Sequence, residues 1–241
     1  MTTISINGAR QWLKTSQHPV ARYGFGLCLQ LRHFELPAPR IFYGAIYYLH
    51  QLVTMALSVS VRIFYWTPLF KSRVTHAGKN LYLFGGMPYL SGPLEIRYGN
   101  NCRISGHTTF SGRAASPSVP QLTLGDNVDV GWQSVIAVGS RVLIGNNVRL
   151  AGKVFIAGYP GHPIDAADRA AGLPDLDHQA GDIIIEDDVW IATGVTIMPH
   201  VRIGKRSIIA SGSIVTADIP ADTLAGGVPA KTIKSLIKAE Q

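Results

Sequence analysis

The sequence predicts a mainly β protein: a left-handed parallel β-helix with an N-terminal apolar helical region and a short C-terminal helix. Two observations lead to this prediction. Aliphatic residues recur every six positions through much of the 241-residue chain, and the N-terminal third is basic and aromatic without that period. Three parts follow from these patterns. They are a helical region at 1–80, a β-helix at 81–225 with an external loop at 157–184, and a turn and helix at 226–241.

The six-residue period is clearest towards the C-terminus. The same grid spacing runs through three stretches of aliphatic residues. They are Leu124, Val130 and Ile136; Ile144, Leu150 and Ile156; and Ile185, Ile191, Ile197, Ile203, Ile209 and Val215. A helix would place apolar residues at steps of three and four, and an ordinary strand at every second residue. A period of six is instead typical of a parallel β-helix, in which each hexad forms a short strand and a turn. Three hexads would make one triangular coil.

The N-terminal third differs in charge and in aromatic content. The chain carries a net charge of +7, and of its 15 acidic residues only Glu35 falls within residues 1–80. The stretch between Arg40 and Arg62 contains no charged residue and is about as long as a bilayer-spanning helix. It could also lie in the membrane interface, or form helices that pack on the protein's own core. We expect contact with a membrane surface. Nucleic acid is not an expected partner, because the basic residues are scattered among apolar ones.

Other classes of site have little support in the sequence. The two cysteines, Cys28 and Cys102, have neither metal-ligand nor redox spacing, and no His/Cys/Asp cluster has the spacing of a metal site. The first residues lack the pattern of a secretory signal. We therefore expect no metal and a cytoplasmic location.

Two segments break the six-residue grid. Residues 111–121 are expected to form a loop between coils, and residues 157–184 form a longer loop that contains "GYPGHPID". A long loop on a rigid scaffold is a favoured place for chemistry. His162 lies there between Gly161 and Pro163, and an imidazole with a pKa of about 6.5 suits a general base at neutral pH.

Four segments carry a family resemblance. "GHPIDAADR", "IIIEDDVWIATGVTIMPHVRIG", "IIASGSIVTADIP" and "AGGVPAKTIK" resemble, in order and spacing, the galactoside and maltose branch of the hexapeptide-repeat acyltransferases. The resemblance covers about residues 122–237 and is absent over 1–75. It implies a homotrimer that holds acetyl-CoA between adjacent subunits, with His162 as the general base. Asp165, three residues further on, is a candidate for the acid that orients His162.

The resemblance also implies binding residues. Trp190 would line the reaction chamber, and the N–H of Thr193 would stabilise the oxyanion. Ser211 and Thr216 would border the pantetheine and the nucleotide of CoA. Lys231 and Lys234 would meet the CoA phosphates. On the acceptor side the resemblance points to Arg169 and Trp132.

Departures from the family pattern narrow the expected acceptor. Ala217 stands where the family has a lysine, and the usual N-terminal helical segment is replaced by the aromatic basic region. We therefore expect a sugar of a cell-surface polysaccharide or of its lipid-linked precursor, rather than a free galactoside or maltose. The expected location is the cytoplasmic face of the inner membrane. The alternatives are a non-catalytic trimeric β-helix scaffold and an acyltransferase that uses another acyl donor, such as acyl carrier protein.

Overall fold

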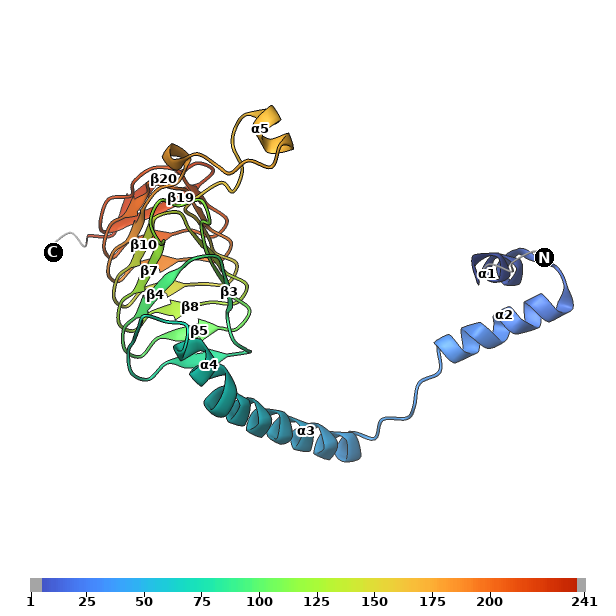
Figure 1. Cartoon of the computed structure of the whole chain (residues 1–241). Coiled ribbons are helices and arrows are strands. Elements are labelled where there is room, and N and C mark those ends of the chain that lie inside the picture. The colour runs from blue at the N-terminus through green and yellow to red at the C-terminus, as the bar shows by residue number, and fades with distance from the viewer. Residues whose placement is uncertain (1–5, 238–241) are drawn as a thin grey trace. The chain divides into compact units, whose positions relative to one another are not determined.

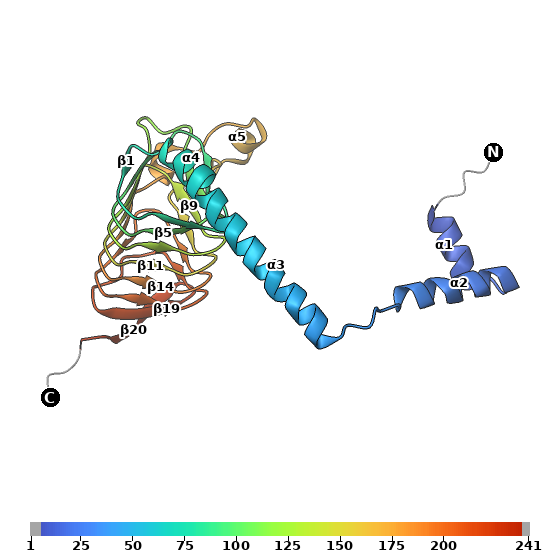
Figure 2. The ribbon, with the colours of Figure 1, turned by 90° about the horizontal axis from the view of Figure 1, so that it is seen from below.

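The computed structural model describes residues 6–237. Six successive coils each add one strand to each of three parallel sheets, named A, B and C here. Figures 1 and 2 show the coils stacked on one another. Sheet A contains β1 (His76–Ala77), β4 (Glu95–Tyr98), β7 (Gln121–Leu124), β10 (Arg141–Ile144), β13 (Ile183–Ile185) and β16 (Arg202–Ile203).

The other two sheets complete each coil. Sheet B contains β2 (Tyr82–Phe84), β5 (Arg103–Ser105), β8 (Asp129–Val130), β11 (Arg149–Leu150), β14 (Trp190–Ile191), β17 (Ile208–Ile209), β19 (Thr223–Gly227) and β20 (Ala230–Ser235). Sheet C contains β3 (Tyr89–Ser91), β6 (Thr109–Gly112), β9 (Val135–Val138), β12 (Phe155–Ala157), β15 (Thr196–Ile197) and β18 (Ile214–Val215). The chain therefore turns three corners per coil, which we name A–B, B–C and C–A.

The residues of the six-residue grid form the core. Their side chains stack inward in the register of the strands, as Ile136, Ile156 and Ile197 do in sheet C. These three side chains are fully buried. Burying one such side chain contributes roughly 1.5–3 kcal/mol, so the stacked rows stabilise the coil along its whole length. The predicted parallel β-helix and the predicted helical N-terminal region are confirmed.

A ladder of asparagine and aspartate side chains holds the A–B corner. Asn127, Asn147 and Asp188 have positive φ, which these residue types tolerate better than other non-glycine residues. Each amide donates to the next side chain along the stack, Asn127 to Asn147 and Asn147 to Asp188, both at 2.9 Å. Each of these side-chain amides thus joins one coil to the next.

The first coil is closed by a short helix. In α4 (Thr67–Lys71) the Phe70 side chain is fully buried, with its ring centroid 6.0 Å from that of Tyr98. The six-residue spacing has a weak first trace at Tyr98, Ile104 and Phe110, and strands β1 to β3 lie before that trace. The β-helix thus gains one coil that its sequence pattern hardly marks.

The predicted C-terminal helix is wrong over the described residues. Strand β20 pairs antiparallel with β19, with Lys231 opposite Gly226 and Lys234 opposite Leu224. A short isolated helix is marginal in water, whereas β19 offers an edge of unpaired backbone groups. The segment therefore pairs with that edge, and the two lysines lie on the new edge strand.

Within residues 6–237, four helical elements precede α4. These elements are α1 (Ile6–Thr15), α2 (Pro19–Arg32), α3 (Arg40–Val61) and the π-helical turn η1 (Arg62–Trp66). The chain divides into two compact units between residues 54 and 55, within α3. No residue of α3 is buried. The continuous helix at 40–71 is long and apolar enough, by length and composition, to cross a membrane.

Candidate active site

The external loop leaves the coils at the C–A corner. It follows β12, contains α5 (Ala166–Ala170) and the 3₁₀ turn η2 (Asp177–Gln179), and returns to β13. Figure 1 shows α5 standing away from the stacked coils. The loop therefore cannot be held by the ladder of strands and needs contacts of its own.

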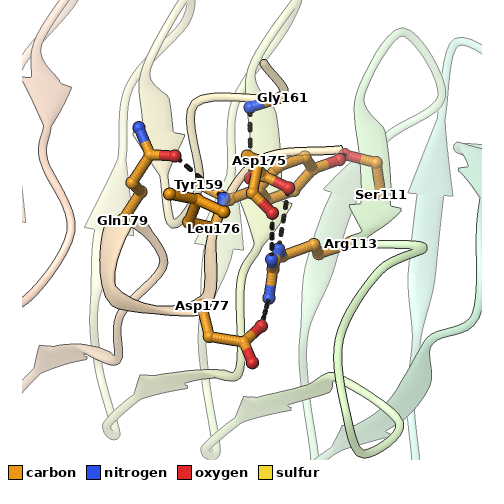
Figure 3. Close-up of polar contacts among 8 residues, drawn as sticks. All are labelled: Ser111, Arg113, Tyr159, Gly161, Asp175, Leu176, Asp177 and Gln179. Carbon is orange, nitrogen blue, oxygen red and sulfur yellow. Dashed lines mark hydrogen bonds and ion pairs between the residues drawn. The ribbon is translucent and has the colours of Figure 1, made fainter. Parts of the chain in front are cut away.

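A buried ion pair provides those contacts. Arg113 follows β6 and donates from Nε to Asp175 Oδ1 at 2.9 Å and from Nη2 to the Asp175 carbonyl at 2.6 Å (Figure 3). A third bond runs from Nη1 to Asp177 Oδ1 at 2.7 Å. The side chains of Arg113 and Asp175 are 3% and 4% exposed. Burial lowers the pKa of the Arg113 guanidinium, but the hydrogen bonds to Asp177 and Asp175 outweigh it and raise that pKa overall. The arginine stays charged and binds the loop to the coil.

The same aspartate reaches the residue before His162. The N–H of Gly161 donates to Asp175 Oδ2 at 3.4 Å (Figure 3), and Gly161 has a φ of +80° that favours glycine. On the other side of His162, Arg169 Nη1 donates to the carbonyl of Pro163 at 3.0 Å and also to that of Ile164. The backbone is therefore anchored on both sides of His162, whose own side chain is exposed. Arg169 makes contacts that position the loop.

Asp165 has a structural role at the start of α5. Its Oδ1 accepts from the N–H groups of Ala167 and Asp168 at 2.8 and 3.0 Å, which caps the helix. Within residues 6–237 no hydrogen bond joins this carboxylate to His162. An orienting role for Asp165 stays a prediction, and the carboxylate would have to share that role with the cap.

An apolar cavity of about 590 Å³ lies where the loop approaches sheet C. Loop residues Tyr159 and Ile164 face Phe155 and Met198 of the coil across it. A second cavity, of about 490 Å³ on sheet A, contains none of the predicted site residues. The loop thus borders an apolar surface on the side of sheet C, next to the segment that carries His162.

A second group of predicted residues gathers at the B–C corner. The register of β8, β11, β14 and β17 aligns Val130, Leu150, Ile191 and Ile209, so the residues two positions later form one row. That corner row is Trp132, Gly152, Thr193 and Ser211. Among the described residues, no group accepts a hydrogen bond from the backbone N–H of any of the four. The corner row therefore presents a free donor in each of four coils, that of Thr193 among them.

The remaining predicted residues lie elsewhere on the coil. Trp190 is in β14 of sheet B and is half exposed, while Thr216 follows β18 of sheet C. Lys231 and Lys234 are exposed on β20 at the edge of sheet B. The C–A corner lies across a triangular coil from sheet B. One chain therefore aligns Trp132, Thr193 and Ser211 along one corner and places Trp190 and His162 on different sides of the coil.

Sequence reasoning missed Arg113 and Asp175. Each lies in one of the two segments that break the six-residue grid, 111–121 and 157–184. Both segments leave the coil at the C–A corner, two coils apart, and this is why an arginine in one can reach an aspartate in the other. The signal available in the sequence was that each of the two irregular segments carries a charged residue, and that both segments leave the coil at the same corner.

Comparisons with known proteins agree with this architecture. Residues 182–217 match the family model described as bacterial transferase hexapeptide (six repeats). YJL218W of Saccharomyces cerevisiae, which carries the name of an acetyltransferase, is 43% identical over 117 residues, or 48% of this chain and 57% of that protein. The galactoside O-acetyltransferase of Escherichia coli is 36% identical over 113 residues, or 47% of this chain and 53% of that protein. The chain thus spans little more than half the length of these relatives.

A solved structure extends the similarity of fold. An N-acyltransferase from Bacillus cereus, AntD in complex with dTDP and coenzyme A, superposes with a TM-score of 0.57 at 18% identity, covering 73% of this chain and 90% of that one. At this identity the likeness concerns the fold. The coils therefore share the fold of this acyltransferase, and residues 182–217 match the hexapeptide model. About half of the chain is similar in sequence to the galactoside O-acetyltransferase.

Proposed function

We propose that this protein is an O-acetyltransferase that carries an acetyl group from acetyl-CoA to a sugar hydroxyl, as a homotrimer of left-handed β-helices. The observation that carries the proposal is the anchored loop. A buried Arg113–Asp175 pair and the Arg169 contacts fix the backbone on both sides of an exposed His162. The related galactoside O-acetyltransferases support the reaction type, and the acyltransferase with bound coenzyme A supports the donor.

The proposed reaction is a direct transfer. A ring nitrogen of His162 accepts the proton of the sugar hydroxyl as the oxygen attacks the thioester carbonyl. The N–H of Thr193, which has no acceptor among the described residues, donates to the oxyanion that forms. When the tetrahedral intermediate collapses, the C–S bond breaks and the thiolate of CoA takes up a proton from the imidazolium. No covalent acyl-enzyme is needed.

The homotrimer follows from the placement of the two groups of residues. His162 lies on the loop at the C–A corner, whereas Trp190 lies on sheet B and Thr193 at the B–C corner. We propose that the loop of one subunit meets the B–C corner of the next. Acetyl-CoA would then lie between two subunits, with its thioester at Thr193. Ser211 and Thr216 would border the pantetheine, and Lys231 and Lys234 would reach the phosphates.

The acceptor is proposed to be part of a cell-surface polysaccharide or its lipid-linked precursor, met at the cytoplasmic face of the inner membrane. The apolar helix α3, none of whose residues is buried, supports a membrane-bound location. Basic residues such as Arg40 and Arg62 near its ends would add attraction to anionic lipid.

The alternatives were a β-helix scaffold without activity and an enzyme that uses another acyl donor. A scaffold gives no reason to place a charged pair in a buried position only to hold an exposed histidine loop. Lysines on β20 favour a donor with phosphates, a property that CoA shares with the prosthetic group of acyl carrier protein.

The test is incubation of the purified protein with labelled acetyl-CoA and membrane extract, followed by mass spectrometry of the products. Label in a glycan and release of free CoA support the proposal, whereas CoA release without glycan label points to hydrolysis alone. Sedimentation with anionic vesicles, for the full chain and for a form without residues 1–75, tests the membrane part. Salt should weaken only the electrostatic share of that binding.

A further inference from the structure

The B–C corner carries a pair of aromatic side chains that take no part in the proposed transfer step. The ring of Trp132 stacks on that of His107, with centroids 4.3 Å apart and planes inclined by 26°. Trp132 is 49% exposed, and His107 is also exposed. An indole exposed in this way offers a large, flat apolar face on which a ligand can stack, and tryptophan is enriched at surfaces that bind partners.

The surroundings of Trp132 leave its ring open. In the corner row the residue one coil towards Thr193 is Gly152, and the register of β5 and β8 puts Gly106 one coil the other way. A Cβ added at Gly152 would lie 3.9 Å from Trp132 Cβ. Glycine on both sides means that no neighbouring side chain of the corner row covers the indole, while the ring of His107 stacks on it.

The corner row also fixes how far Trp132 lies from Thr193, whose N–H is proposed to hold the oxyanion. Trp132 is two coils from Thr193, and adjacent strands lie about 4.8 Å apart, so the two positions are separated by roughly 10 Å. That separation is larger than one pyranose ring. Beyond a sugar whose hydroxyl attacks at Thr193, the next sugar in the same glycan is therefore placed to cover Trp132.

Resting on the proposed function, we propose that Trp132 and His107 form a second sugar-binding subsite, which makes the acceptor an oligosaccharide or longer glycan rather than a monosaccharide. The apolar C–H face of a pyranose would stack on the indole, and His107 holds the ring in place from its other side. The free N–H groups of Gly152 and Trp132 would donate to sugar oxygens along the row. Trp132 and His107 thus determine specificity and take no part in the chemical step.

The experiment uses the full-length protein with acetyl-CoA and glycan fragments. The fragments are chemically deacetylated and come from partial hydrolysis of the surface polysaccharide of the source cells, separated by size from one sugar upward. Initial rates of CoA release give kcat/KM for each size, in wild type and in Trp132→Ala, Trp132→Phe and His107→Ala. Tyr89→Ala, which removes an aromatic ring that is 67% exposed on β3, is the matched control.

We expect kcat/KM of the wild type to rise about three- to tenfold from one sugar to two or more. Trp132→Ala should abolish that rise, so that its kcat/KM is about the same for one sugar as for longer fragments. Trp132→Phe should keep part of the rise, and Tyr89→Ala all of it. Equal kcat/KM for every size in the wild type would overturn the subsite while leaving the acetyltransferase intact, and so would an equal loss for all sizes in Trp132→Ala. If the wild type acetylates no fragment of any size, the proposed function itself fails, and the subsite with it.

Discussion

Two corners of the same β-helix carry the candidate site, and they are built in different ways. At the B–C corner, Trp132, Thr193 and Ser211 are part of the ladder, and their positions follow from strand register. At the C–A corner, His162 lies on a long loop outside the ladder, and its position depends on Arg113 and Arg169. The comparison indicates a division of tasks. The rigid corner holds groups that must stay fixed, and the loop carries the proposed base, which a tight corner could not project.

Removal of the proposed base should give the largest effect. If His162 is the general base, His162→Ala takes away assistance that typically contributes about 10²–10⁴-fold in rate. The fold should be unchanged, because the His162 side chain is exposed and lies outside the stacked core. Acetyl transfer and CoA binding, measured side by side, check this. Transfer within a few-fold of wild type would remove His162 from the mechanism, and an equal loss of CoA binding would give it a role in donor binding.

Mixing of subunits tests whether the two corners belong to different chains. His162→Ala spoils only the loop, and Thr193→Pro removes only the corner N–H, a group that has no acceptor among the described residues. Each variant alone should be inactive. In a coexpressed trimer that contains both variants, an intact loop from one chain meets an intact corner of the next at about one interface in three, whichever variant is present twice.

Activity of about a third of wild type in the mixed, doubly tagged trimer is the expected result. A mixed trimer as inactive as its parents would mean that loop and corner of the same chain meet. Trp190→Ala on β14, used in place of Thr193→Pro, checks that the outcome does not come from strain caused by proline.

The buried ion pair should affect the loop more than the whole fold. Arg113→Ala leaves Asp175 buried without its partner, and breaking a buried pair typically costs about 3–5 kcal/mol. The loop can relieve this cost by detaching, since the ladder does not hold it. We expect kcat to fall about ten- to hundredfold through misplacement of His162. Hydrogen exchange should rise within residues 158–182 and stay low in the coils.

Arg113→Lys is the control, because a lysine keeps the charge but cannot make the three hydrogen bonds of the guanidinium. It should recover part of the protection and part of kcat. Uniform loss of protection in loop and coil would show that the pair stabilises the whole fold instead.

The rigid corner was largely predictable from the sequence, and the loop anchor was not. A six-residue period fixes which residues point inward, so the buried positions of Ile136, Ile156 and Ile197 follow from the spacing alone. The period also fixes the register, which aligns Trp132 with Thr193. The Arg113–Asp175 pair joins two irregular segments 62 residues apart, and no local pattern encodes such a contact. The prediction of a C-terminal helix failed for a similar reason, because pairing with the free edge of β19 decided the structure of that segment.

The smallest effect is expected from a substitution of Glu186, which follows β13 of sheet A and lies at neither the B–C nor the C–A corner. Glu186 accepts from the Lys205 N–H at 2.8 Å and from Arg202 Nε at 2.8 Å. The Lys205 N–H and then the Arg202 guanidinium lower the pKa of this carboxyl. A lowered folded-state pKa adds stability above the unfolded value of about 4.3, and that stability is lost as pH falls through the folded-state pKa.

Glu186→Gln keeps an acceptor for the Lys205 N–H but removes the charge. Because partly exposed ion pairs contribute little, we expect its Tm at pH 7 to lie about 2 °C below that of wild type. The gap should close as the pH is lowered below the folded-state pKa, where the wild-type carboxyl is also neutral. Thermal unfolding from pH 7 to pH 3 measures this, and kcat at pH 7 should stay unchanged because neither corner is touched. A gap that does not depend on pH would mean that shape rather than charge sets the effect, and a loss of kcat would extend the functional surface to sheet A.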